Sequence, residues 1–348
     1  MSVRAASQTE ALRPSPPHGR LNRSAISVRG RGQAPAAVVF QMTYTEVGAV
    51  ERFTGMVIRS DGSQVTVRHS QGQEWRCVLR GRLRKEFQGV TNPVAVGDHV
   101  EVRAGDAFQG VVEGVLPRRN RLARRAAGDP PREQVLAANL DLVIVVVAAP
   151  PRPTVMDRYL ALARGGGSEA LLCVNKIDLV DGGSLDPMLA SYLTAGVPVL
   201  RTSALRSDGL EELRPRLAGR LVAFIGPSGG GKSSIINALD PALRARVGGL
   251  AVSGRGAHTT SWAVIYPMGD GFVVDTPGLR EITFLDDEGP QGSLDLFPEI
   301  TALAADCHFR DCSHTHEPRC AVKARLEAGE LDPAAYRRYT RLARAGRL

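Results

Sequence analysis

The chain has 348 residues, of which 43% are hydrophobic, so it is long enough for two or three domains with cores of their own. Its net charge of +8 favours an anionic partner such as nucleic acid, although residues 1–41, with six arginines and one glutamate, carry five of these charges. The longest apolar run, Leu140 to Pro151, is too short to cross a bilayer, so we expect a cytoplasmic protein without membrane contact.

Residues 1–41 are rich in Arg, Pro, Ser and Gly and show no hydrophobic periodicity. This composition predicts a disordered basic tail. An organellar transit peptide fits as well, and so does translation from an upstream start with Met42 as the true initiator. The sequence does not decide whether the tail persists in the mature protein.

Residues 50–118 contain short alternating segments separated by glycine-containing turns, a pattern typical of a small OB-type β-barrel. The expected strands are Phe53–Arg59, Gln64–His69, Glu74–Leu79, Asp98–Arg103 and Gly110–Leu116. Such barrels often bind oligonucleotides, and a basic group follows the third strand, namely Arg80, Arg82, Arg84 and Lys85. The alternative is a structural β-module with a solvated basic loop. We interpret Pro117 to Pro131 as a basic connector.

Residues 132–285 alternate longer strands with helical segments, which predicts an open, mostly parallel α/β sheet. The expected strands are Leu142–Ala148, Ala170–Val174, Val197–Leu200, Leu221–Ile225, Ala263–Tyr266 and Phe272–Val274. The expected helices are Asp157–Arg164, Asp186–Ala195, Leu210–Leu217 and a helix beginning near Ile235.

A glycine-rich stretch lies between the strand Leu221–Ile225 and the helix after it, and it reads Gly-x-x-x-x-Gly-Lys-Ser. Glycines let backbone N–H groups converge on an anion at a helix N-terminus, so the stretch predicts a nucleoside triphosphate site. We expect Lys232 to reach the β- and γ-phosphates and Ser233 to hold Mg²⁺. The predicted contacts are Gly226, Pro227, Ser228, Gly229, Gly230, Gly231, Lys232, Ser233 and Ser234.

Other motifs follow neighbouring strands and predict selectivity for guanine. Asp178 can accept hydrogen bonds from two guanine donors that adenine lacks, Lys176 can stack on the base, and Asn175 can brace the neighbouring loops. Thr202-Ser203-Ala204, after the next strand, is the expected companion segment, which lets a backbone amide contact the guanine oxygen, and Ser203 and Ala204 are its predicted site residues. Asp275 and Gly278 can orient Mg²⁺ and sense the γ-phosphate.

The order of these motifs is unusual, because the guanine motif comes before the phosphate loop. The same sheet results when the original termini of a GTPase are joined and the chain is reopened elsewhere, since such termini lie close together. We therefore predict a circularly permuted α/β P-loop GTPase domain. The segment after Asp275–Gly278 then leads directly into the C-terminal domain and could couple nucleotide state to its position.

Residues 295–348 contain three cysteines and a histidine at a spacing typical of a closed structural Zn²⁺ site, followed by a basic helical end. The predicted ligands are Cys307, Cys312, His314 and Cys320. His308 and His316 are expected on the surface. Cys77 and Cys173 lie in strand-like runs and are expected to be buried thiols.

From about Val50 to the C-terminus the chain resembles the ribosome small-subunit-dependent GTPase A family (RsgA/YjeQ). The matching motifs include Ala138-Asn139-Leu140-Asp141, Gly256-x-His258-Thr259-Thr260 and the segment from Asp311 through Glu317 to Val322. Two departures are Gly230, where the family usually has a larger apolar residue, and Arg319, where it usually has Gly. The resemblance implies a late-stage 30S maturation factor that binds 16S rRNA, hydrolyses GTP to GDP and phosphate, and is stimulated by the small subunit. We expect a monomer with one structural Zn²⁺ and with Mg²⁺ bound alongside GTP.

A Ras-type water-orienting Gln is missing after Asp275–Gly278, where Leu279 and Arg280 stand instead, so slow intrinsic turnover is expected. His258 is the candidate for positioning the water, and the alternative is an exposed loop histidine that contacts RNA. Either Thr259 or Thr260 should sense Mg²⁺. The second functional hypothesis is an RNA-binding module that GTP clamps with little turnover. The sequence does not indicate which rRNA helices are contacted.

Overall fold

The computed structural model describes residues 51–61, 64–83, 90–126, 132–181, 183–243, 263–275 and 296–345. They belong to one compact unit, Met42–Leu348. The predicted tail, residues 1–41, lies outside the described residues. In the described part of the chain, no helix is long and apolar enough to cross a membrane.

The N-terminal part is a five-stranded barrel, as predicted. Its strands pair in the order β1-β2-β3-β5-β4, and the β1–β4 pairing closes the barrel. Alternate residues, among them Val67, Cys77 and Val112, point inward and are almost fully buried. The strands are β1 (Arg52–Ser60), β2 (Gln64–His69), β3 (Glu74–Leu79), β4 (His99–Ala104) and β5 (Gln109–Val115).

The hairpin between β4 and β5 is a two-residue turn of the type that needs positive φ at both central residues. The Gln109 N–H donates to the Asp106 carbonyl at 3.1 Å, and Ala107 and Phe108 have φ of 52° and 57°. Glycine and asparagine favour these positions, whereas other residues pay about 1–2 kcal/mol each in this conformation. Ala107-Phe108 is therefore a costly choice for this turn.

The interpretation of Pro117 to Pro131 as a connector is wrong. Within it lies β6 (Arg121–Ala126), which pairs antiparallel with β7 (Arg132–Ala138) in a separate two-stranded sheet. Leu122 of β6 and the consecutive residues Val135 to Ala138 of β7 are buried, while Arg121 is exposed. The three arginines of β6 hid this strand in the sequence.

The second half of the chain forms the expected open sheet. Its strands lie in the order β10-β9-β8-β11-β13-β12, with all pairs parallel except β12–β13. Strand β12 also pairs with β1 of the barrel, which joins both halves into one sheet. The strands are β8 (Leu142–Ala148), β9 (Ala170–Asn175), β10 (Val199–Arg201), β11 (Leu221–Ile225), β12 (Ala263–Met268) and β13 (Gly271–Asp275).

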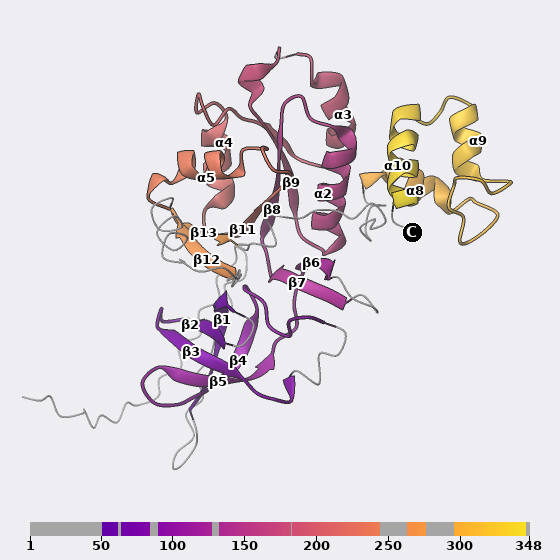
Figure 1. Cartoon of the computed structure of the whole chain (residues 1–348). Helices are drawn as coiled ribbons and strands as arrows, with labels where there is room; N and C mark the ends of the chain where they lie inside the picture. Colours follow the sequence, from indigo (N-terminus) through magenta and orange to yellow (C-terminus); the bar gives the residue numbers. More distant parts are fainter. Residues whose placement is uncertain are drawn as a thin grey trace, which may run out of the picture. The chain divides into compact units, whose positions relative to one another are not determined.

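The central strands are buried on both faces, which explains their continuous hydrophobic sequences. In β8, Val143 and Val145 belong to one hydrophobic cluster and Ile144 and Val146 to the other. Figure 1 shows α2 and α3 on one side of β8 and β9, and α4 and α5 on the other. The helices are α2 (Pro153–Gly165), α3 (Asp186–Thr194), α4 (Leu210–Leu217) and α5 (Lys232–Leu239). Helix α2 begins four residues before the expected Asp157, because Pro153 fits the first helical turn.

The C-terminal part is helical, as predicted. It contains α8 (Pro298–Ala304), α9 (Ala321–Glu327) and α10 (Pro333–Ala345), with the cysteine-rich loop between α8 and α9. Ile300 and Val322 are fully buried, and Tyr339 is 2% exposed. These residues provide the hydrophobic contacts that hold the three short helices together.

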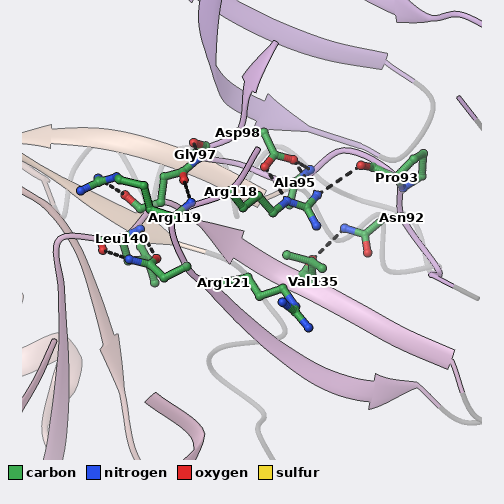
Figure 2. A network of polar contacts seen from close by, with 12 residues as sticks. Asn92, Pro93, Ala95, Gly97, Asp98, Arg118, Arg119, Arg121, Val135 and Leu140 are labelled. Atoms are coloured by element: carbon green, nitrogen blue, oxygen red, sulfur yellow. Dashed lines mark hydrogen bonds and ion pairs between the residues drawn. The ribbon is translucent and has the colours of Figure 1, made fainter. Parts of the chain in front are cut away.

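A buried ion pair holds the segment that leaves the barrel. The carboxylate of Asp98, which is fully buried, accepts hydrogen bonds from Nε and Nη2 of Arg118 at 2.7 and 2.8 Å. The Ala95 N–H donates to the same carboxylate at 2.8 Å. Figure 2 shows Arg118 between Asp98 and the carbonyl of Pro93. The buried carboxylate has no solvent to stabilise its negative charge, so the positive charge of Arg118 is essential to this arrangement.

Arg118→Met should lower the free energy of unfolding by about 3–5 kcal/mol, because it leaves the Asp98 carboxylate buried without a counter-charge. The matched control is Arg121→Met, which removes a half-exposed pair with Glu133 and should cost about 0–1 kcal/mol. Urea unfolding followed by circular dichroism measures both. Equal losses for the two variants would contradict this account.

Candidate functional site

The phosphate loop connects β11 to α5, as the sequence predicts. Gly226 and Gly231 have φ of 140° and 98°, which other residues rarely adopt. A Cβ at Gly226 would lie 2.0 Å from the Val146 carbonyl oxygen, and one at Gly231 would lie 2.0 Å from Asn175 Nδ2. The glycines therefore allow the loop to lie directly against β8 and the end of β9.

Lys232 is the first residue of α5 and its ammonium group lies over the loop. Its Nζ donates to the carbonyl oxygens of Gly226 and Pro227 at 2.6 and 2.9 Å. Burial lowers the pKa of Lys232. Ser233 and Ser234, which follow in the first turn of α5, are exposed.

Gly230 is one of the two positions at which the chain departs from the family that it resembles. A Cβ added there would lie 2.7 Å from the Val146 carbonyl oxygen. The glycine thus permits a closer approach of the loop to β8. A pocket of about 270 Å³ opens beside the same loop, between Pro227–Gly230 and the segment Pro150–Arg152 that leads into α2.

The side chain of Asn175, 1% exposed at the end of β9, joins three segments. Its Nδ2 donates to the Gly230 carbonyl at 3.2 Å. Its Oδ1 accepts from Thr202 Oγ1 at 3.2 Å and from the Ala204 N–H at 3.1 Å. The predicted bracing by Asn175 is present. Thr202 belongs to the predicted segment Thr202-Ser203-Ala204, but the bond of its hydroxyl to Asn175 was not predicted.

Asp178 lies in a short 3-10 turn, Ile177–Leu179, that follows β9. Ser203 Oγ donates to Asp178 Oδ1 at 2.5 Å, so the two predicted guanine segments meet. This hydrogen bond is the main reason why the pKa of Asp178 lies below its usual value. Lys176 adopts φ of 63°, which turns the chain sharply after the strand. The carboxylate is therefore ionised and held in place at neutral pH.

The predicted residues thus gather where the parallel strands end. Asn175 follows β9, Ser203 follows β10, and the phosphate loop follows β11. Asp275 ends β13, which lies beside β11 in the sheet. The remaining predicted residues, His258, Thr259, Thr260 and Gly278, lie outside the described residues.

The cysteine-rich loop forms a candidate metal centre. The ligand atoms of Cys307, Cys312, His314 and Cys320 all lie within 4.8 Å of one another. Nδ1 of His314 is 3.4 Å from Cys307 Sγ and 3.5 Å from Cys320 Sγ, and those two sulfurs are 3.9 Å apart. These separations fit the edges of a tetrahedron with metal–sulfur bonds of about 2.3 Å. Burial lowers the pKa of His314 and so favours the neutral imidazole that binds metals.

A carboxylate that was not predicted as functional organises the metal loop. Glu317 accepts hydrogen bonds from the N–H groups of Ser313, Thr315 and His316 at 3.0–3.2 Å. The Ser313 hydroxyl also donates to Glu317 at 2.6 Å, and this contact is the main reason why the pKa of Glu317 is far below its usual value. Arg319, the second departure from the family pattern, adopts φ of 56°. The turn therefore has the conformation that glycine favours, at a cost of about 1 kcal/mol for arginine.

Helix α10 links this centre to the α/β sheet. The hydroxyl of Tyr336 donates to the His314 carbonyl at 2.7 Å. Arg338, which is 8% exposed, contacts the helices of the α/β domain instead. Arg338 Nη2 and Nε donate to the buried Asp157 of α2 at 2.6 and 3.0 Å. Its guanidinium also lies 4.0 Å from the ring centroid of Tyr192 in α3. Nothing in the sequence distinguished Arg338 from the many arginines around it.

The strand order, the glycine loop and the motif order together define a circularly permuted GTPase fold with an N-terminal barrel and a C-terminal metal centre. The family model for the RsgA GTPase matches residues 115–285, and the model for the RsgA N-terminal domain matches residues 54–112. The chain belongs to the RsgA GTPase family.

Individual relatives agree with this assignment. The chain is 40% identical over 296 residues to a "Small ribosomal subunit biogenesis GTPase RsgA" from Gemmatimonas aurantiaca, covering 83% of this chain and 96% of the relative. A protein of the same name from Pseudomonas aeruginosa is 39% identical, with coverage of 82% and 84%. Among solved structures, YjeQ from Thermotoga maritima is similar with a TM-score of 0.63, 32% identity and coverage of 84% and 97%. YloQ, described as a circularly permuted GTPase, has a TM-score of 0.61, 26% identity and coverage of 85% and 96%.

The Cys₃His cluster should hold about one metal ion per chain, and His314→Ala should lose it, because the three cysteines alone do not complete a tetrahedral site. The structure of α9 and α10 should then be lost at a lower temperature. His316→Ala is the matched control, since His316 is exposed two residues away. Metal content after dialysis and circular dichroism measure the effect. Retention of a full equivalent of metal by His314→Ala would contradict the assignment.

Proposed function

We propose that the chain is a GTP hydrolase that acts in the biogenesis of the small ribosomal subunit, as the names of its relatives indicate for them. The observation that supports this most is the side chain of Asn175, which joins the phosphate loop to the segment around Ser203. A single nucleotide could therefore contact both groups of residues. The relatives are named GTPases, so the alternative of an RNA clamp with little turnover is not favoured.

The guanine end of the site consists of Asp178, Lys176, Ser203 and Ala204. Held by Ser203, the Asp178 carboxylate would accept from the two nitrogen donors of guanine, and the Lys176 stem would cover the base. The Ala204 N–H, expected to face the guanine oxygen, donates to Asn175 in the described structure. Adenine lacks the two nitrogen donors of guanine that Asp178 would bind, so GTP is preferred to ATP.

The phosphate end consists of the loop Gly226–Ser234. On binding, the Lys232 ammonium would exchange its two loop carbonyls for phosphate oxygens, which are stronger acceptors because they are charged. Mg²⁺ would neutralise phosphate charge when bound, with Ser233 and either Thr259 or Thr260 as its ligands. Asp275 would orient that ion and Gly278 would sense the γ-phosphate.

Hydrolysis requires a positioned water, and the sequence lacks the Ras-type glutamine. We assign this role to His258, which the small subunit would bring into place. Slow turnover of the isolated chain and faster turnover on the ribosome follow from this assignment.

The other parts of the proposal concern binding and organisation. The barrel (50–118) and the metal domain (295–348) flank the GTPase domain (132–285) and would contact the 30S subunit and its 16S rRNA. We propose Zn²⁺ as the resident ion of the Cys₃His centre, because thiolates and imidazole in a tetrahedral set suit it best. The protein would act as a cytoplasmic monomer.

GTP turnover of the full chain, measured with and without purified small subunits, tests the proposal. The subunits should raise the turnover number by at least about 10-fold, because positioning of the attacking water typically contributes 10-fold or more. ATP should not be hydrolysed under either condition. Absence of stimulation would contradict the assigned function.

The same assay tests His258. The variant His258→Ala should lose stimulation by the small subunit while its affinity for a fluorescent GDP analogue is unchanged, because the residue acts on water and not on the nucleotide. His18→Ala, a histidine of the N-terminal tail outside both matched domains, is a control for general loss of a histidine. Stimulation retained in His258→Ala would remove the residue from the mechanism.

A further inference from the structure

Phe108 is a large aromatic residue at the tip of the β4–β5 hairpin, and its side chain is exposed. Its relative exposure is 56%, whereas most large hydrophobic residues of the barrel are buried. Trp75 of β3 lies behind it, with ring centroids 5.3 Å apart and an interplanar angle of 70°. The Arg76 N–H donates to the Phe108 carbonyl at 2.9 Å, which fixes the backbone. The ring is thus presented to solvent by a rigid support.

The support continues into the barrel as a row of aromatic rings. Trp75 lies 5.0 Å from Phe53, and Phe53 lies 5.1 Å from His69, centroid to centroid. These three rings are half-buried and close this end of the barrel. Only Phe108 projects beyond them, so its ring has a free face while the others serve the fold.

The conformation of Phe108 is unfavourable for a residue with a side chain. Both Ala107 and Phe108 have positive φ in a turn that glycine and asparagine favour. Glycine would be more stable than a larger residue in this conformation. Backbone strain at such an exposed position therefore indicates that the side chain has a function. The exposed ring gains little from burial that could offset the strain.

The exposed surface of the barrel carries both arginines and carboxylates, Glu74 and Asp106 among the latter. Arg52, Arg80 and Arg103 all pair with Glu113, at 3.2, 3.7 and 3.2 Å. Arg76, adjacent to Phe108 through the backbone hydrogen bond, has no carboxylate partner among the residues that the structure describes. An unpaired guanidinium group next to an exposed aromatic ring fits a partner with phosphates and flat bases.

We propose that Phe108 stacks against an unpaired base of single-stranded RNA while Arg76 contacts a neighbouring phosphate. This inference rests on the proposed function, since it names the element of the barrel that would contact RNA. Stacking on an aromatic ring is insensitive to base identity, because every base has a flat face. The site therefore recognises unpaired RNA without reading its sequence.

The test compares two substitutions in one hairpin of the full chain. Phe108→Gly removes the ring and relieves the strain, whereas Ala107→Gly relieves strain and keeps the ring. The probe is a fluorescein-labelled oligouridylate of about 12 nucleotides, the length that one barrel can contact, with an RNA duplex as comparison. Phe108→Gly should raise the Kd for the single strand by about 5- to 150-fold, the range for loss of one stacked base. Ala107→Gly should leave the Kd unchanged.

Thermal unfolding separates this role from a structural one. Both variants should keep or raise the Tm, by about 2–4 °C where strain is relieved. A fall in Tm of Phe108→Gly together with weaker binding would assign the ring to the fold and overturn the proposal. Equal Kd values for Phe108→Gly and the natural chain would also overturn it.

Two further outcomes are informative. If Phe108→Gly binds the oligouridylate normally but no longer binds small subunits, the partner of the ring is a protein and the proposal is wrong. If the natural chain binds no single-stranded RNA, the proposal is wrong as well. The proposed function is judged separately, by stimulation of GTP turnover, so the two can fail independently.

Discussion

The nucleotide site depends on one buried amide. Asn175 uses both ends of its side chain to connect the carbonyl of Gly230 with Thr202 and the N–H of Ala204. A buried polar group without partners costs about 1–3 kcal/mol, so none of these segments can move without a penalty from the others. The proposed phosphate and guanine contacts are thereby held in one geometry, although Asn175 and Gly230 are 55 residues apart in the sequence.

The permuted order of the motifs determines which domain follows the nucleotide site along the chain. Strand β13 carries Asp275, and the next described element along the chain is α8 of the metal domain. Helix α10 of that domain returns to α2 through Arg338 and Asp157. A buried pair of this kind is costly to break, by about 3–5 kcal/mol. The metal domain is therefore connected to the GTPase both by the backbone after β13 and by a side-chain contact that the sequence did not indicate.

Most of the architecture could be predicted because hydrophobic alternation and glycine turns are local signals. Strands such as Gln64–His69 and Leu142–Ala148 have the predicted bounds, and the cysteine spacing predicted the metal cluster. The hairpin containing β6 was missed, since arginines make up three of the six residues of that strand. The roles of Glu317 and Arg338 could not be predicted. They depend on which backbone groups and helices fold against them, and charged residues of the same type are frequent throughout the chain.

The central claim is that guanine is bound by Asp178 within a permuted site, and Asp178→Asn tests it most directly. Affinities for GTP and xanthosine triphosphate are measured by competition with a fluorescent GDP analogue. The variant should bind GTP at least about 10-fold more weakly, because charge-assisted hydrogen bonds are lost, and should bind xanthosine triphosphate better. Asp181→Asn, an exposed carboxylate three residues further on, should change neither affinity. An unchanged preference for GTP in Asp178→Asn would contradict the account.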